Sequence, residues 1–554
     1  MITHEEAIKI GLWGNKIIEL SEKLEEFLKE NFSLDNLPER KDFINTREKK
    51  QFPMVLPEST LSNTIKKEIK AIKDLEFTEL PLERLKYSIG KSYYELIKIR
   101  NAKVTDIVDG VVRPLTITAL REFLSFANKH KIIVVPTAGK TSVTEALTPT
   151  KQSLALDVLK LNKIINFYPE SLLIEVEGGI LLPDLEKWLS GKGYKLGHSP
   201  QSFMYSTVGG SIASRGSGQF SSHFGSMRHM VHSLTVETPI GTFTERKNIV
   251  PESAVGPSLS ELFIGSEASL GIISKAMLRI KPIQEQLFKA FLFKSFQEGI
   301  RAIQEFYQAG HHPATIRLSD EEETELLLLS STSTTNATIK DKLFKKIGKY
   351  YLEQKGFITN HRCLLILQLE GDEEINNVSM NKITSLCKKY QAVSLGKTPA
   401  KVWYDQRYEL PYMRENILQL GILVDTVETS ATFDKLFETY TSTIKCLKQI
   451  CPIAMAHVSH VYPEGASLYF TFMVEDDFNW KDPVITKIRK VVAENFINHS
   501  TISHHHGVGK AYKEFIHKER SEIENELLVT IKNKLDPNGI LNPSSGLIYN
   551  LGSK

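Results

Sequence analysis

Three glycine- and hydroxyl-rich segments carry residue types and spacings suited to ligand chemistry. They are PTAGKTSV at 136–143, HSPQSFMYSTVGGSIASRGSG at 198–218 and GSEASLG at 265–271. Small residues let backbone approach a ligand closely, and successive backbone N–H groups can form an anion-binding nest. Together the segments indicate a large dinucleotide bound mainly by backbone. None is a GxGxxG fingerprint, and Val134 stands where a P-loop would need its first glycine, so Rossmann and Walker sites are not expected.

The elements that must position these segments change in character along the chain. Residues 1–95 read as a charged, helical N-terminal extension with a loop over 33–60. From 96 to 284, short apolar runs such as IIVVP alternate with amphipathic stretches, which is typical of an α+β domain. Longer elements over 285–500 predict a second α+β domain, and 501–554 forms a C-terminal segment. The predicted fold class is therefore α+β.

Composition narrows the function classes. The 554 residues carry 69 Lys and Arg against 66 Asp and Glu, and a net charge of +3 argues against a nucleic-acid partner. Four cysteines without a CxxC pair predict buried free thiols in a reducing compartment. We see no signal peptide and no apolar run near the ~20 residues that span a bilayer, so we expect a cytoplasmic protein with peripheral membrane contact left open.

Several motifs together resemble a known flavoprotein superfamily. PTAGKTSV, HSPQSFMYSTVGG with SRGSG, GSEASLGIIS and LDPNGILNP resemble the FAD-binding signatures of the vanillyl-alcohol oxidase, or PCMH, type. ATIRLSD, VETSAT, ASLYFTF and SHHHGVGK resemble, within it, the alkyldihydroxyacetonephosphate (alkylglycerone-phosphate) synthase family. The resemblance covers roughly residues 85–545. It implies a PCMH-type FAD-binding domain of two α+β subdomains, an α+β substrate-binding cap, and a C-terminal tail that returns to the flavin.

The resemblance also implies a reaction in ether-lipid synthesis. The acyl group of acyl-dihydroxyacetone phosphate would be exchanged for a long-chain fatty alcohol. Noncovalently bound FAD would act without net redox change, its N5 atom bonding to the substrate carbon. We expect a homodimer, an apolar tunnel for the chains and a peripheral membrane-docking surface.

Site residues follow from matching this chain to the family motifs. The implied cofactor contacts are Pro136, Thr137, Ala138, Gly139, Lys140, Thr141, Ser142, Gln201, Ser202, Ser206, Thr207, Gly210, Ser214, Arg215, Ser217, Glu267, Ser269, Leu270, Gly271 and Ile273. The implied catalytic residues are His198, Arg317, Tyr469, His504, His505 and His506, and the substrate-binding residues are Arg414 and Thr426.

These residue types suit the implied chemistry. The Arg414 guanidinium would clamp a phosphate headgroup, and Thr426 would add a hydroxyl. His505 would be the base that removes the C1 proton, with its two neighbouring histidines orienting it or touching the flavin. Tyr469 would protonate the leaving carboxylate. We expect no metal site, because consecutive histidines point in different directions.

This chain departs from the family at several positions. Ala138, Gly139 and Lys140 replace a usual glycine triplet, and Ala268 and Ser269 replace glycine and threonine. His457 stands where arginine is common, and we expect it and His460 to be structural. Two alternatives remain open: an FAD-linked oxidase or dehydrogenase of 2-hydroxy acids such as D-lactate or glycolate, and a flavin-binding protein without catalysis.

Overall fold

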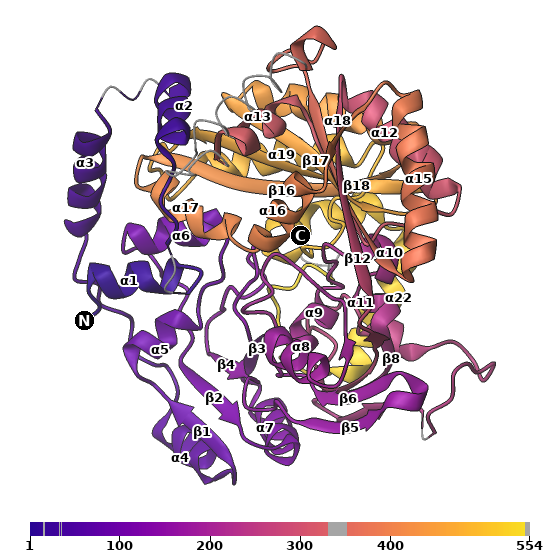
Figure 1. The fold of residues 1–554 in the computed structure, drawn as a ribbon. Coiled ribbons are helices and arrows are strands. Elements are labelled where there is room, and N and C mark those ends of the chain that lie inside the picture. Colours follow the sequence, from indigo (N-terminus) through magenta and orange to yellow (C-terminus); the bar gives the residue numbers. More distant parts are fainter. Residues whose placement is uncertain (15–16, 33, 35, 247, 331–351, 549–554) are drawn as a thin grey trace.

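The computed structural model describes residues 1–14, 17–32, 34, 36–246, 248–330 and 352–548. Its strands form sheets of four, five, two and seven strands. In Figure 1 the purple and magenta strands β1–β6 and β8 lie below the seven-stranded sheet, whose labelled strands run from dark magenta (β12) to orange (β16, β17 and β18), and helices α1, α2 and α3 lie at the left. Among the described residues, no helix combines the length and the apolar character that a membrane crossing requires.

The N-terminal region differs from the sequence-based expectation in two ways. Its elements are α1 (His4–Gly11), α2 (Glu22–Phe32), α3 (Leu37–Lys49), α4 (Asn63–Ala71), β1 (Leu75–Thr78), α5 (Pro81–Lys86) and α6 (Tyr93–Arg100). The predicted loop over 33–60 is wrong where α3 forms. Pro38 lies in the first turn of this helix, where a missing N–H removes no intrahelical hydrogen bond. The region is also not purely helical, since β1 pairs with β2 of the FAD-binding region.

The first FAD-binding sheet has the strand order β1-β2-β4-β3. Its other elements are β2 (Gly110–Pro114), α7 (Ile117–His130), β3 (Ile133–Thr137) and β4 (Ser153–Asp157). Strand β4 runs parallel to both β2 and β3. Leu541, near the end of the chain, bridges to Val134, so the tail does return to this sheet.

The second FAD-binding sheet is antiparallel, in the order β5-β6-β10-β8-β9. The strands are β5 (Ile164–Tyr168), β6 (Leu173–Glu177), β8 (Val231–Thr238), β9 (Gly241–Thr244) and β10 (Ile272–Arg279). Short helices α8 (Leu182–Ser190), α9 (Val208–Ala213), α10 (Ser221–Phe224) and α11 (Met227–Met230) lie between β6 and β8 in the chain. A two-stranded ribbon pairs β7 (Tyr194–Lys195) with β11 (Lys281–Pro282).

The seven-stranded sheet forms the cap, in the order β15-β12-β14-β13-β17-β18-β16. Its strands are β12 (Glu285–Phe293), β13 (Thr315–Ser319), β14 (Cys363–Gly371), β15 (Val393–Gly396), β16 (Ile422–Thr432), β17 (Ile453–Val461) and β18 (Gly465–Glu475). The described helices around it are α12 (Phe296–Gln308), α13 (Glu321–Ser330), α15 (Glu373–Lys389), α16 (Thr398–Gln406), α17 (Leu410–Leu418), α18 (Phe433–Lys448) and α19 (Val484–Phe496).

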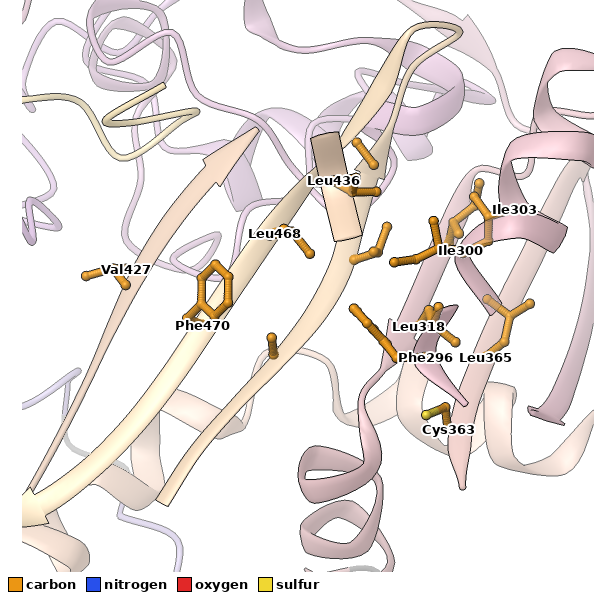
Figure 2. Packing of buried hydrophobic residues seen from close by; sticks show 14 of the residues in the cluster. Phe296, Ile300, Ile303, Leu318, Cys363, Leu365, Val427, Leu436, Leu468 and Phe470 are labelled. Carbon is orange, nitrogen blue, oxygen red and sulfur yellow. The ribbon is translucent and has the colours of Figure 1, made fainter. Parts of the chain in front are cut away.

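Alternation along the cap strands separates a packed face from an open one. Leu468 and Phe470 of β18 join Phe296, Ile300 and Leu365 in one buried cluster (Figure 2). Successive strand residues point to opposite faces, so Tyr469 lies on the other face of the sheet. In the strand register, Tyr469 is opposite Glu428 of β16 on one side and His457 of β17 on the other. Three polar side chains thus form one row across the cap.

The C-terminal segment contains α20 (Gly509–Tyr512), α21 (Ile516–Glu519) and α22 (Glu522–Leu535). After α22 the chain reaches the first sheet, where the Asn542 backbone N–H donates to the Val134 carbonyl at 2.9 Å. Residues 503–509 thereby run between the cap and the FAD-binding region.

Candidate active site

A cavity of about 490 Å³ is bounded by FAD-binding segments on one side and by cap strands on the other. The predicted site residues that line it are Pro136, Thr137, Ala138, Gly139, Lys140, Thr141, Ser142, His198, Gln201, Ser202, Ser206, Thr207, Gly210, Ser214, Ser217, Glu267, Ile273, Arg317, Arg414, Thr426, Tyr469, His505 and His506. Residues from far-separated parts of the chain therefore line one cavity.

The loop 138–142 follows β3 and forms one end of the cavity. Gly139 packs so closely on the 198–218 segment that an added Cβ would lie 2.0 Å from the Tyr205 carbonyl oxygen. Lys140 has a φ of 55°, in the left-handed region that glycine favours. Its ammonium lies 4.4 Å from the Tyr87 ring centroid, and burial lowers its pKa to about 8. This departure from the glycine triplet keeps the left-handed turn of a nest.

The 198–218 segment forms a second wall. Thr207 caps α9, its hydroxyl accepting the Gly210 N–H at 3.1 Å. Gly209 donates to the Gly178 carbonyl at 2.7 Å, a contact too close for a side chain. Small residues here bring backbone of α9 against the second sheet and leave the hydroxyls of Ser206 and Ser217 beside the cavity.

Five predicted site residues lie outside the cavity lining. Ser269 and Leu270 are buried, and Gly271 packs against Val236, because this stretch joins the core of the second sheet just before β10 begins. Arg215 is exposed after α9. His504 lies behind His505. The lining instead includes Ala268 and Ile272, one residue removed from the predictions.

The Glu267 carboxylate positions the C-terminal segment. It accepts the backbone N–H of Val508 at 2.6 Å, of Gly509 at 2.9 Å and of Gly546 at 2.9 Å. Asn542, in the LNP motif, donates its amide to the Glu267 carbonyl at 2.7 Å and also lines the cavity. Glu267 therefore fastens the tail beside the cavity.

The histidine triplet is held by a second carboxylate, Glu428, to which no sequence motif assigned a role. Glu428 accepts the backbone N–H of His504 at 2.7 Å, of His505 at 3.1 Å and of His506 at 2.9 Å, together with the Ser503 hydroxyl at 2.9 Å. Burial would raise the Glu428 pKa, yet the histidines and these N–H groups hold it below its usual value. One strand carboxylate thus fixes three consecutive imidazoles at the end of the Tyr469 row.

His505 is the triplet member best placed to act as a base. Its ring is nearly parallel to that of Tyr469, with centroids 6.1 Å apart. Burial lowers the His505 pKa well below its ordinary value, and the neighbouring imidazoles lower it further. The ring is therefore neutral at pH 7 and can accept a proton.

Tyr469 holds its proton toward the cap. Its hydroxyl donates to the Thr426 hydroxyl at 3.0 Å, and burial raises its pKa to about 12. A phenol in this state is a donor at neutral pH, which suits a general acid. Thr426 contacts Tyr469 directly.

Arg317 is held in a buried network with two partners. It donates to the Glu323 carboxylate at 2.9 Å and to His457 Nε2 at 2.9 Å. His457 Nδ1 lies 2.9 Å from the same carboxylate, and its ring stacks on Tyr469 at 5.1 Å. His457 and His460 both line the cavity, and the expectation that they are structural stays a prediction. Arg317, His457 and Glu323 thus form one buried network beside Tyr469.

Arg414 lies on α17, and only one of its two terminal guanidinium nitrogens has a hydrogen-bond partner among the described residues. One terminal nitrogen, Nη1, donates to the Lys91 carbonyl at 2.8 Å. The other, Nη2, is buried and has no hydrogen-bond partner among the described residues. Trp13 of the N-terminal region lies 5.8 Å away and also lines the cavity, a contribution the sequence did not reveal. A buried, half-satisfied guanidinium facing a cavity suits an anionic ligand.

His198 is buried with neither ring nitrogen hydrogen-bonded to a described residue. Burial lowers its pKa to about 3, so it is neutral. Unpaired buried polar atoms are costly, and a ligand in the cavity would satisfy them.

Ring nitrogens of His460, His504 and His505 all lie within 4.8 Å of one another. That spacing would also admit a metal ion, but His504 and His505 already face each other through Nδ1 atoms 3.0 Å apart. The absence of a metal site stays a prediction.

Beyond the row of polar groups the cavity wall becomes apolar. Its lining residues there are Leu326, Met413, Ile417, Val424, Met455 and Met473. Leu24 and Leu28 of α2 pack in the same cluster as Ile417 and Met455. The N-terminal region thus covers the apolar end of the cavity.

Comparison with known proteins gives consistent results. Residues 108–246 match the family model described as "FAD binding domain", and 284–545 match "FAD linked oxidases, C-terminal domain". Alkyldihydroxyacetonephosphate synthase of Trypanosoma brucei brucei is 30% identical, covering 83% of this chain and 76% of that protein.

Solved structures agree. One of alkyldihydroxyacetonephosphate synthase superposes with a TM-score of 0.75 at 25% identity, covering 88% of this chain and 86% of that one. p-Cresol methylhydroxylase, at 16% identity and a TM-score of 0.64 over 89% and 99% of the two chains, shares the fold. Relatives named for glycolate or D-lactate oxidation are less similar, at 23–24% identity.

Proposed function

This chain belongs to the alkyldihydroxyacetonephosphate synthase family of FAD-dependent enzymes, and from that premise we propose that it exchanges the acyl group of acyl-dihydroxyacetone phosphate for a long-chain fatty alcohol. The observation that carries this proposal is the meeting of the Tyr469 row, the histidine triplet and the half-free Arg414 in one cavity. The 2-hydroxy-acid oxidase alternative has weaker support among the relatives.

The cavity fits FAD. The nest at 138–142 and the α9 wall offer backbone to a pyrophosphate, and the unpaired His198 nitrogens mark polar positions that a ligand would fill. When bound, the flavin supplies an N5 atom that can hold the substrate carbon without net redox change. The residues of this chain that would hold it noncovalently are those of 136–142, 201–217 and 267–273 that line the cavity.

The side chains divide the remaining work. Arg414 binds the phosphate headgroup through its free guanidinium nitrogen. Neutral His505 takes the C1 proton, and Tyr469 gives its hydroxyl proton to the departing fatty acid carboxylate. The His457 ring stacks on Tyr469 and keeps that ring in place, and Arg317 and Glu323 hold His457 by hydrogen bonds.

The apolar end of the cavity would receive the hydrocarbon chains. Methionine and leucine side chains there offer a deformable wall for chains of differing shape. Trp13 lines the cavity beside Arg414, whose guanidinium lies 5.8 Å from its ring centroid.

The deciding experiment measures incorporation of labelled hexadecanol into acyl-dihydroxyacetone phosphate by protein of verified flavin content. Exchange that is independent of oxygen supports the proposal. Flavin bleaching by D-lactate under anaerobic conditions, without hexadecanol exchange, would instead indicate the oxidase.

We also propose a cytoplasmic homodimer that contacts membranes peripherally. All four cysteines are free thiols, which suits a reducing compartment. Lipid substrates require access to a bilayer surface. Light scattering tests the dimer, and flotation with phosphatidylcholine vesicles tests the membrane contact.

A further inference from the structure

A chain of hydrogen bonds leads away from the cavity behind His505. His505 Nδ1 lies 3.0 Å from His504 Nδ1, and His504 Nε2 lies 2.8 Å from the Tyr462 hydroxyl. Of these three described residues, only His505 belongs to the cavity lining. The bonds therefore connect the reaction space to a side chain outside it.

We propose that His504 and Tyr462 form a proton relay that carries the proton taken up by His505 out of the cavity. This inference rests on the proposed function, in which His505 is the base. It assigns a role to Tyr462, and it gives His504 a task different from orienting its neighbour.

The geometry requires one proton in each link. Two imidazole nitrogens 3.0 Å apart form a hydrogen bond only when one carries a hydrogen and the other a lone pair. His504 then uses both of its nitrogens, one as donor and one as acceptor. The same atom positions allow these hydrogen bonds to run in either donor-to-acceptor direction, as a proton relay requires.

Proton transfer along this chain balances. In the starting arrangement, His505 Nδ1–H donates to His504 Nδ1, and His504 Nε2–H donates to the Tyr462 oxygen, so His505 Nε2 is free to accept a proton. After that uptake, the Nδ1 proton of His505 moves to His504 Nδ1. The Nε2 proton of His504 moves to the Tyr462 oxygen as that hydroxyl releases its own proton. One proton enters at His505, one leaves at Tyr462, and no electron is transferred.

The residue at the exit end belongs to a turn whose next two residues are at the surface. Tyr462 is half-buried in the turn between β17 and β18, where its N–H donates to the Gly465 carbonyl at 2.8 Å. The next two residues, Pro463 and Glu464, are exposed. In the proposed relay, a proton released by Tyr462 passes to water at this edge of the cap.

Charges around the relay keep it neutral between turnovers. His504 faces Glu428, His506 and the stacked ring of His460, and its pKa is lowered, chiefly by burial. Tyr462 faces Ser217 of the cavity lining, Glu428 and Arg215, and burial raises its pKa to about 12. The Tyr462 hydroxyl thus accepts one proton as it releases another, and it does not need to become a phenolate.

The test compares Tyr462→Phe with Tyr307→Phe, each in FAD-loaded protein assayed with EDTA present. Tyr307 is a suitable control because its hydroxyl donates to the Ser222 carbonyl, outside the cavity lining. We expect Tyr462→Phe to lower kcat about tenfold or more in dilute buffer, short of the roughly 100-fold or more that a direct acid or base contributes, with KM within about twofold. Added imidazole should restore several-fold of the activity in this variant alone.

Two results would overturn the relay while leaving the proposed function intact. One is a wild-type kcat in Tyr462→Phe, and the other is a lost kcat that imidazole does not restore. If the wild-type protein shows no hexadecanol exchange, the proposed function fails separately. The relay is then judged by ¹⁵N spectra of labelled histidine, where unchanged His504 ring shifts in Tyr462→Phe would exclude it.

Discussion

The rings of Tyr469 and His505 lie nearly parallel, 22° apart, with their centroids separated by 6.1 Å. Tyr469 comes from a cap strand and His505 from the C-terminal segment, so two distant parts of the chain face each other across one cavity. A donor and a neutral acceptor in this arrangement can move two protons in one reaction.

Replacing Tyr469 by Phe should abolish exchange without loss of flavin. The ring and its stacking on His457 remain, while the hydroxyl that donates to Thr426 is removed. We expect kcat to fall about 100-fold or more, on the scale of a missing general acid. Flavin absorbance and hexadecanol incorporation measure the two properties, with Thr441→Val on the exposed face of α18 as a control. Full activity would remove Tyr469 from the mechanism.

Gly139→Ala should weaken FAD binding. Its Cβ would lie 2.0 Å from the Tyr205 carbonyl oxygen, so the loop must move away from the α9 wall. Gly191→Ala is the matched control, because its Cβ would meet atoms no closer than 3.5 Å. We expect at least about a tenfold higher Kd for FAD, equal to about 1.4 kcal/mol, in the first variant only. Fluorescence titration of apoprotein with FAD measures both, and equal affinities would contradict the nest.

Arg414→Gln should weaken binding of the phosphorylated substrate. The substitution removes the charge and the buried, unpaired Nη2 group that faces the cavity. Because charge-assisted bonds contribute about 1.5–3 kcal/mol, we expect KM for acyl-dihydroxyacetone phosphate to rise about 10- to 100-fold. The KM for hexadecanol should change little. Arg228→Gln, at an exposed pair with Glu261, should behave as wild type, and an unchanged KM in Arg414→Gln would place the phosphate elsewhere.

The pH dependence should report a base with a depressed pKa. His505 must be neutral to accept a proton, and its pKa lies well below 6.5, chiefly because it is buried. Activity should therefore be constant near neutral pH and fall only as pH drops through that lowered pKa. An acid limb centred above pH 6.5 in kcat profiles would contradict His505 as the base.

Glu428→Gln should separate the positioning of the triplet from general stability. An amide has one acceptor oxygen in place of two, so a backbone N–H of the triplet faces a donor, at a cost of about 1–3 kcal/mol. The Glu428 carboxylate also lies 3.5 Å from His505 Nδ1 and favours the charged form of that base, so its removal should lower the His505 pKa. We expect a lower kcat and an acid limb moved to lower pH.

Glu428→Asp restores the charge and should return the acid limb toward its wild-type position. Glu261→Gln, at the exposed pair with Arg228, controls for loss of an unrelated carboxylate. An unshifted profile in Glu428→Gln would show that the carboxylate only stabilises the fold.

Sequence alone determined the residue types of this site and the strands that carry several of them. Glycine runs predict close backbone approach wherever they fold, and strand alternation separates Tyr469 from Phe470 in any sheet. The site motifs at 136–142, 201–217 and 504–506 could therefore be predicted from the local sequence pattern. Helix α3 could not be predicted in this way, because a proline in the first turn of a helix looks in the sequence like a residue that ends one.

Tertiary structure decided which groups act on which. Cross-strand register placed Glu428 and His457 beside Tyr469, and it gave the triplet a carboxylate 76 residues away in the chain. Packing of the N-terminal region and of the C-terminal segment also brought Trp13 to the cavity and Tyr462 to His504. The pKa values follow from this, because burial and neighbouring charge depend on packing between distant segments, which no local pattern encodes.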